Sequence, residues 1–175
     1  MSLVSELERL ISVLGSDDLE LSQISLPAVA ERIAKSFSVR VNEVAIMGMS
    51  LRWRHLHFLV PEALKKVGYI PLSSTSALAA RTARESRPEI INNFGSTRHA
   101  CVFEGVKIGN ESAEAIQKII SAPILYEGKV VGIIQISRKG ESAKTVGPDF
   151  TAAELGKVLA LCKPLGKILQ RLAVE

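Results

Sequence analysis

Apolar residues occupy nearly every position of the segment from Ile119 to Gly140, IISAPILYEGKVVGIIQISRKG. Glu127-Gly128 interrupts the run, and glycine at the second loop position accepts the positive φ that a two-residue hairpin turn requires. A half-buried strand would alternate apolar and polar residues, so the continuous apolar flanks predict strands that are covered on both faces. The segment therefore predicts a β-hairpin in the middle of a sheet.

Two other segments carry apolar residues at the spacings of three and four that are typical of amphipathic helices. The first spans residues 2–14 and ends near Gly15, and the second is a long C-terminal helix that begins at Asp149 or Thr151. In both helices the apolar residues form one seam, and we expect these seams to meet in a homodimer. The seam residues are Leu3, Leu7, Leu10, Leu14, Leu155, Cys162, Leu165 and Leu169.

Between these helices the pattern changes several times, which predicts a mixed fold of helices and strands. We expect a second helix at 26–37, strands within 41–50 and 52–60, a short strand at 69–72, an alanine-rich helix at 75–86, a strand at 89–92 and a long loop at 93–112, with EAIQK at 114–118 able to form a short helix. Residues 1–20 then form an N-terminal amphipathic helix and its connector, and residues 21–175 form one domain that ends in the long helix.

Composition and charge narrow the function classes. The 175 residues, 47% of them hydrophobic, suffice for one compact core. The net charge of +4 comes from Lys and Arg scattered among Glu, so a nucleic-acid partner is not favoured. The two cysteines lie far apart, which indicates neither a disulfide framework nor a zinc site. No apolar run approaches the roughly 20 residues that cross a bilayer, so we expect a cytoplasmic protein without a membrane partner.

Three phrases of the sequence resemble the GAF domain family. YIPLSSTSALAARTARESRPEIINN is similar to the family's strand, helix and strand segment, SAPILYEGKVVGIIQIS to its central hairpin, and PDFTAAEL to the start of its last helix. The resemblance covers about residues 26–172. It implies an α/β protein of the α+β type, with a central antiparallel sheet of five or six strands, terminal helices on one face and a ligand pocket on the other.

The resemblance also implies a range of ligands, and the residues argue against two of them. Cyclic-nucleotide members carry an Asn-Lys pair where this chain has Ser137-Arg138, so Arg138 and Glu154 would form a structural clasp rather than a ligand contact. Bilin-binding members carry an Asp-Ile-Pro run that this chain lacks. The methionine sulfoxide reductase branch needs several clustered cysteines, whereas Cys101 is the only cysteine of the predicted loop.

The expected pocket is walled by the alanine-rich helix and the long loop. Serines and threonine surround the unpaired amides at the start of that helix, which is either an anion site or simple capping. The candidate ligand-binding residues are Ser73, Ser74, Thr75, Ser76, Asn92, Asn93, Arg98, His99 and Cys101. His55 and His57 share one face of a predicted strand but lack a third ligand nearby, so we expect no metal and no cofactor.

Three functions remain open. The first is a non-catalytic module that senses a small molecule of unknown identity and acts on a signalling effector protein. The second is an interaction or dimerisation module with a vestigial pocket. The third is a thiol enzyme or chromophore-binding protein that uses Cys101. We expect no catalytic constellation, because the sequence contains no Ser/His/Asp set, paired acids or phosphate-binding loop at a recognisable spacing.

Overall fold

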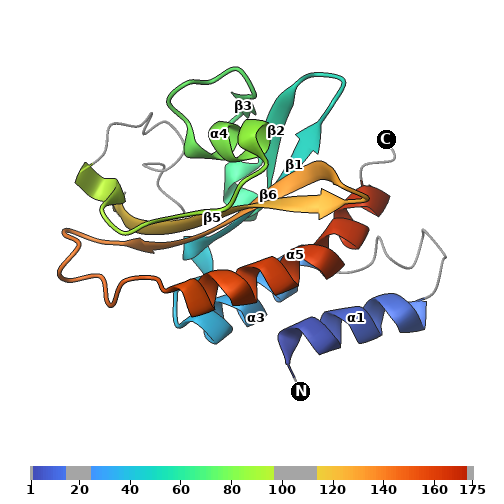
Figure 1. The fold of residues 1–175 in the computed structure, drawn as a ribbon, viewed down its shortest axis with the longest axis horizontal. Coiled ribbons are helices and arrows are strands. Elements are labelled where there is room, and N and C mark those ends of the chain that lie inside the picture. Colours follow the sequence, from blue (N-terminus) through green and yellow to red (C-terminus); the bar gives the residue numbers. More distant parts are fainter. Residues whose placement is uncertain (1, 15–24, 97–113, 173–175) are drawn as a thin grey trace.

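The computed structural model describes residues 2–14, 25–96 and 114–172 (Figure 1). Its centre is a six-stranded antiparallel sheet with the order β3-β2-β1-β6-β5-β4. The strands are β1 (Val44–Ser50), β2 (His55–Val60), β3 (Tyr69–Pro71), β4 (Glu89–Ile91), β5 (Ile116–Tyr126) and β6 (Lys129–Lys139). The predicted α+β fold with its antiparallel sheet is confirmed.

Helices cover both faces of this sheet (Figure 1). The α-helices are α1 (Leu3–Leu14), α3 (Leu26–Phe37), α4 (Leu78–Glu85) and α5 (Ala152–Leu172), and the short 3-10 turns are η1 (Val41–Glu43), η2 (Glu62–Leu64) and η3 (Phe94–Ser96). Helices α1, α3 and α5 lie on one face, and α4 lies on the other. Among the described helices, none is both long and apolar enough to cross a bilayer.

The predicted hairpin forms the middle of the sheet. Strands β5 and β6 pair along their length, and both turn residues have positive φ, 49° at Glu127 and 79° at Gly128. These values fit a two-residue turn whose twist matches that of the strands. Isoleucines alternate between the two faces and are fully buried on both, as the continuous apolar pattern predicts.

Two glycines let α5 lie directly on the sheet. A Cβ on Gly166 would be 2.1 Å from the carbonyl oxygen of Leu125, and a Cβ on Gly132 would be 2.6 Å from Leu169 Cδ1 of α5 and 2.4 Å from the carbonyl oxygen of Met47 on the neighbouring strand. Neither site has room for a side chain, because real Cβ atoms do not approach backbone oxygens so closely. Thr151, one of the two predicted caps, starts α5 in a capping box with Glu154.

Four of the eight residues of the predicted dimer seam are buried within a single chain, so for these four the predicted contact with a second copy is wrong. Leu7 and Leu169 are each 2% exposed, and Cys162 and Leu165 are also buried in the core under α1 and α3. Leu3 and Leu155 pack against that core, Leu10 is exposed, and the side chain of Leu14 lies outside the described part. Apolar residues at spacings of three and four are typical both of a helix that packs on a sheet and of a coiled coil, so the spacing alone did not separate the two.

Two other boundaries differ from the sequence-based prediction. The helix expected at 75–86 begins at Leu78, because the residues before it form a turn. The segment 114–118, interpreted as a possible short helix, contains the start of β5. Five residues are too few to separate a helix from a strand by the period of their apolar positions.

We predict that Leu169→Ala lowers the free energy of unfolding by about 2–5 kcal/mol, because it leaves a cavity between α5 and the sheet. The matched control is Leu159→Ala on the same helix, where the side chain is 42% exposed and the loss should be about 0.5 kcal/mol. Urea unfolding measures both. Equal losses of unfolding free energy in the two variants would contradict the burial of Leu169 within the chain. A smaller mass of Leu169→Ala in sedimentation, with its stability retained, would show that Leu169 lies at an interface between chains.

Candidate functional site

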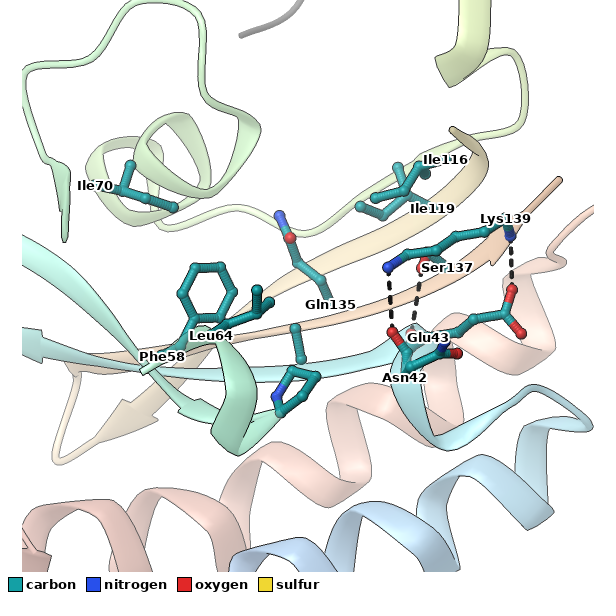
Figure 2. Close-up of a pocket in the computed structure, with 12 residues that line it drawn as sticks. Asn42, Glu43, Phe58, Leu64, Ile70, Ile116, Ile119, Gln135, Ser137 and Lys139 are labelled. Atoms are coloured by element: carbon teal, nitrogen blue, oxygen red, sulfur yellow. Dashed lines mark hydrogen bonds between the residues drawn. The ribbon is translucent and has the colours of Figure 1, made fainter. Parts of the chain in front are cut away.

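A pocket lies on the α4 face of the sheet, and we call it the α4-side pocket (Figure 2). Its cavity has a volume of about 30 Å³, room for about two water molecules, within a hollow of about 430 Å³ that includes open solvent. The described lining consists of Asn42, Glu43, Ala45, Phe58, Pro61, Leu64, Ile70, Ile116, Ile119, Gln135, Ser137 and Lys139. The pocket lies on the face opposite the terminal helices, as predicted.

Strand alternation sends the polar residues of β6 into this pocket. Gln135, Ser137 and Lys139 are two residues apart, so their side chains share the α4 face, while Ile136 and Arg138 point to the α5 face. Figure 2 shows Gln135 between an apolar group on one side and a mixed group on the other, which consists of Asn42, Glu43, Ser137 and Lys139 together with Ile116 and Ile119. The pocket is therefore amphipathic along its length.

The apolar end is formed by Phe58 of β2, Leu64 of η2 and Ile70 of β3, which belong to a hydrophobic cluster on the α4 face. This cluster is separate from the core beneath α5. An apolar wall of this kind favours an apolar part of a ligand through the burial of its surface.

The polar end is organised around the buried carboxylate of Glu43. Its Oε2 accepts from the amide of Lys139 at 2.6 Å, and its Oε1 accepts from the amide of Arg40 at 2.8 Å and from Arg40 Nε at 3.2 Å. Arg40 also pairs with Glu114 at 2.6 Å, and these hydrogen bonds to Glu114 and Glu43 raise the pKa of Arg40 above its usual value. Glu43 is thus occupied by the protein itself, and its role is to fix η1 against β6.

A buried chain of hydrogen bonds orients Gln135. Thr82 Oγ1 donates to the carbonyl of Leu78 at 3.0 Å and lies 2.7 Å from Ser121 Oγ, while Gln135 Nε2 lies 3.2 Å from the same Ser121 oxygen. Since the Thr82 proton goes to Leu78, Ser121 donates to Thr82 and must accept from Gln135. This direction places the amide N–H of Gln135 toward Ser121. It also ties α4 to the sheet.

The predicted serine and threonine group does not line the α4-side pocket. Ser73, Ser74, Thr75 and Ser76 lie in the turn before α4, where Ser74 Oγ accepts from the Ala77 amide at 3.2 Å. Arg84 Nη1 fixes this turn by donating to the carbonyls of Leu72 and Ser74. The contact of Ser74 with the Ala77 amide supports the capping alternative. Helix α4 itself begins at Leu78, and its N-cap residue Ala77 provides no side-chain cap.

The other candidate ligand-binding residues are also placed elsewhere or lie outside the described residues. Asn92 Oδ1 accepts from the Phe150 amide at 2.9 Å and Asn92 Nδ2 donates to the Phe150 carbonyl at 3.1 Å, which joins the end of β4 to the start of α5. Asn93 is exposed, and its carbonyl accepts from Ser96. Three candidates, Arg98, His99 and Cys101, lie outside the described residues.

The proposed clasp between Arg138 and Glu154 is present on the α5 face. Arg138 Nη2 lies 3.9 Å from Glu154 Oε2, and its guanidinium lies 4.6 Å from the ring centroid of Phe150. The long ion-pair distance indicates that the stacking on Phe150 holds Arg138 as much as the charge does. Neither Arg138 nor Glu154 lines the α4-side pocket.

The histidine pair lies at the β1–β2 end of the sheet. The rings of His55 and His57 are 6.0 Å apart, and His55 packs on Tyr69 at 4.1 Å. Desolvation, and secondarily the charge of His55, lowers the pKa of His57. Within residues 2–14, 25–96 and 114–172 no group of three or more His, Cys, Asp or Glu side chains could hold a metal ion.

The family assignment follows from a comparison of the whole chain with family models. The GAF domain model matches residues 24–169. The chain belongs to the GAF domain family. None of the curated proteins compared with this GAF domain matches it.

Solved structures agree with the GAF fold at low sequence identity. The GAF domain of an Acinetobacter phosphoenolpyruvate-protein phosphotransferase matches with a TM-score of 0.66 and 18% identity over 97% of this chain and 95% of that one. Residues 122 to 287 of a methyl-accepting chemotaxis protein match with a TM-score of 0.67 and 11% identity over 98% and 96%. Free methionine-R-sulfoxide reductase from Neisseria meningitidis matches with a TM-score of 0.60 and 14% identity over 94% and 86%. These identities support the fold alone.

Sequence reasoning missed the polar lining of the α4-side pocket. A signal was present, because Gln135, Ser137 and Lys139 recur at every second position of a strand whose other residues are mostly apolar. No pattern in the sequence indicates the role of Glu43, because its partner Lys139 is 96 residues away. Only the folded sheet brings these groups together.

We predict that Glu43→Ala lowers the free energy of unfolding by about 2–3 kcal/mol, because the amides of Lys139 and Arg40 lose a charged acceptor. The exposed Glu62→Ala in η2 serves as the control and should cost about 0.5 kcal/mol. Chemical denaturation measures the difference. Similar losses for both variants would show that Glu43 does not fix η1.

Proposed function

We propose that this GAF domain is a non-catalytic sensory module that binds a small amphipathic molecule in the α4-side pocket. The observation that carries the proposal is the oriented amide of Gln135 at the boundary between the apolar and polar ends. Its Nε2 is occupied by Ser121, and its Oε1 has no partner among the described residues. A ligand would therefore place an apolar group near Phe58 and a hydrogen-bond donor at Gln135 Oε1.

The ionisable groups of the pocket support binding rather than catalysis. The described lining contains two, Glu43 and Lys139, and the Glu43 carboxylate is already bound by backbone amides. A general base needs to reach a substrate proton, and a carboxylate held by the chain's own donors is poorly placed for that. In a cytoplasmic signalling protein, occupation of this pocket would then act on an attached or associated effector.

A thermal-shift screen of small metabolites tests the proposal. A compound that binds only the folded state adds about 2.7 kcal/mol at 100 times its dissociation constant. We expect a hydroxyl-, amide- or ammonium-bearing compound with an apolar group to raise Tm of the wild type. Gln135→Met, which keeps the shape and removes the acceptor, should weaken its binding at least tenfold.

The control for this screen is Gln117→Met, a matched substitution on β5 outside the pocket lining. It should retain the shift. A stabilising compound that binds Gln135→Met and wild type equally well would refute the proposed contact. If no compound raises Tm although the protein is folded, the function is better explained as that of an interaction or dimerisation module.

A thiol enzyme is the second candidate, since three of the matching structures are free methionine-R-sulfoxide reductases. The chain has two cysteines, and Cys162 is a poor nucleophile. It is buried on α5, and burial raises the pKa of its thiol to about 12. At neutral pH this leaves far less reactive thiolate than an ordinary cysteine carries. A thiol mechanism would thus depend on Cys101.

We predict that Cys162 resists iodoacetamide in the folded Cys101→Ser variant. A pKa of about 12 against an ordinary 9.0 lowers the thiolate fraction about a thousandfold. Mass spectrometry of the alkylated protein measures the rate, and the same variant in urea should react normally. Fast labelling of folded Cys101→Ser would contradict the burial of Cys162. If Cys101 of the wild type reacts with iodoacetamide no faster than a model thiol, the thiol-enzyme function is excluded.

A further inference from the structure

A second concavity lies at the other end of the sheet and on its other face, and we call it the Trp53 groove. It has a volume of about 580 Å³ and lies between the β1–β2 turn and the last residues of α5. Figure 1 shows this turn extending from the sheet toward the end where α5 finishes. The residues used below are Arg52, Trp53, His55, His57, Tyr69 and Gln170. None of them lines the α4-side pocket.

One wall of the groove is formed by His57, which packs over a glycine of the neighbouring strand. Gly48 pairs with His57 on one side and with Gly132 on the other. A Cβ on Gly48 would be 2.9 Å from His57 Nε2, so the imidazole lies over the glycine. On the α5 side the groove is lined by Gln170 and Leu172. Since His57 pairs with Tyr69 in the β2–β3 register, His55, His57 and Tyr69 share this face of the sheet.

The walls are aromatic and exposed. Trp53 is 66% exposed and Tyr69 is 62% exposed, and His55 packs on Tyr69 with the ring planes 31° apart. Large aromatic side chains that remain exposed around one concavity are unusual for a surface without a partner. Their faces are suited to stacking on a planar ring.

The described lining of the groove contains one cation, Arg52. The Arg52 guanidinium lies 5.0 Å from the centroid of the Trp53 ring. Among the described residues, no acidic side chain lines the groove and no carboxylate pairs with Arg52. By contrast, Arg32, Arg40 and Arg81 each form an ion pair with a glutamate. A cation next to aromatic rings, without an internal counter-ion, is complementary to an anion that carries a planar ring.

We propose that the Trp53 groove is a second ligand site, which binds planar aromatic anions of the nucleoside monophosphate class. The ring stacks on Trp53, and Arg52 binds the phosphate, with Gln170 and the histidines as further polar contacts. The volume of the groove lies within the range of about 300–1,000 Å³ that small-molecule sites occupy. This site is independent of the α4-side pocket and does not rest on its proposed function.

Trp53 is the only tryptophan of the chain, so its fluorescence reports on this groove alone. The full chain is titrated with adenosine monophosphate, with adenosine and with ribose 5-phosphate, which separate the ring from the phosphate. Excitation at the red edge of the indole absorption avoids the adenine ring. We expect saturable quenching by the monophosphate and at least tenfold weaker binding of either half.

Variants locate the site. Arg52→Ala and Tyr69→Ala should each weaken binding of the monophosphate at least tenfold, and because both side chains are exposed the variants should keep the wild-type Tm. Arg87→Ala removes the same charge from an exposed position at the end of α4 and should leave binding unchanged. Gln135→Met should also leave it unchanged, which separates this site from the α4-side pocket.

Three outcomes would overturn the proposal. The first is quenching that does not saturate with any of the three probes. The second is equal weakening by Arg52→Ala and Arg87→Ala, which would show that net charge alone is responsible. The third is saturation by a single-stranded oligonucleotide but not by the monophosphate, which would indicate a nucleic-acid surface instead of a small-molecule site.

Discussion

The β5–β6 hairpin requires cover on both of its faces, and the rest of the fold meets that requirement. Its strands are each 11 residues long and carry fully buried isoleucines on both sides. Helix α5 spans 21 residues and covers one face at close range, because Gly132 and Gly166 remove the side chains that would hold it away. Helix α4 spans only eight residues on the other face. That mismatch in length leaves the ends of the strands uncovered by helix, and the α4-side pocket lies there.

The elements that could be predicted from the sequence are those with local signals. Glu127-Gly128 specifies a tight turn through backbone conformation alone, and the apolar flanks specify buried strands. The helix before residue 86 was predicted at the right place but began three residues early. Its serines do satisfy an amide, yet Ser74 does so in a turn before Ala77 rather than in the first turn of α4. A cluster of serine and threonine indicates that a helix begins nearby. The first residue of that helix depends on tertiary contacts such as those of Arg84 with the preceding turn.

The candidate site was harder to predict, because its polar residues act through partners that are distant in sequence. Asn92 was predicted to bind a ligand, whereas the folded chain uses both ends of its amide on Phe150, 58 residues away. The leucine seams were assigned to a partner chain for a related reason. A helix that packs on its own sheet and one that packs on a second copy need the same apolar spacing, so periodicity cannot separate them. Burial of Leu7 and Leu169 within one chain decides the question for those residues.

The two faces of the sheet carry separate hydrophobic clusters, and this separation has a consequence for how the domain can diversify. The cluster beneath α5 holds most of the buried residues and has close backbone contacts at two glycines, so it tolerates little change. The cluster of Phe58, Leu64 and Ile70 is smaller and borders the α4-side pocket. Substitutions in the smaller cluster can alter the shape and polarity of that pocket while the larger one maintains the fold. A lineage with this architecture can therefore change the shape and polarity of the pocket by a few replacements on one face, without first acquiring compensating mutations in its core.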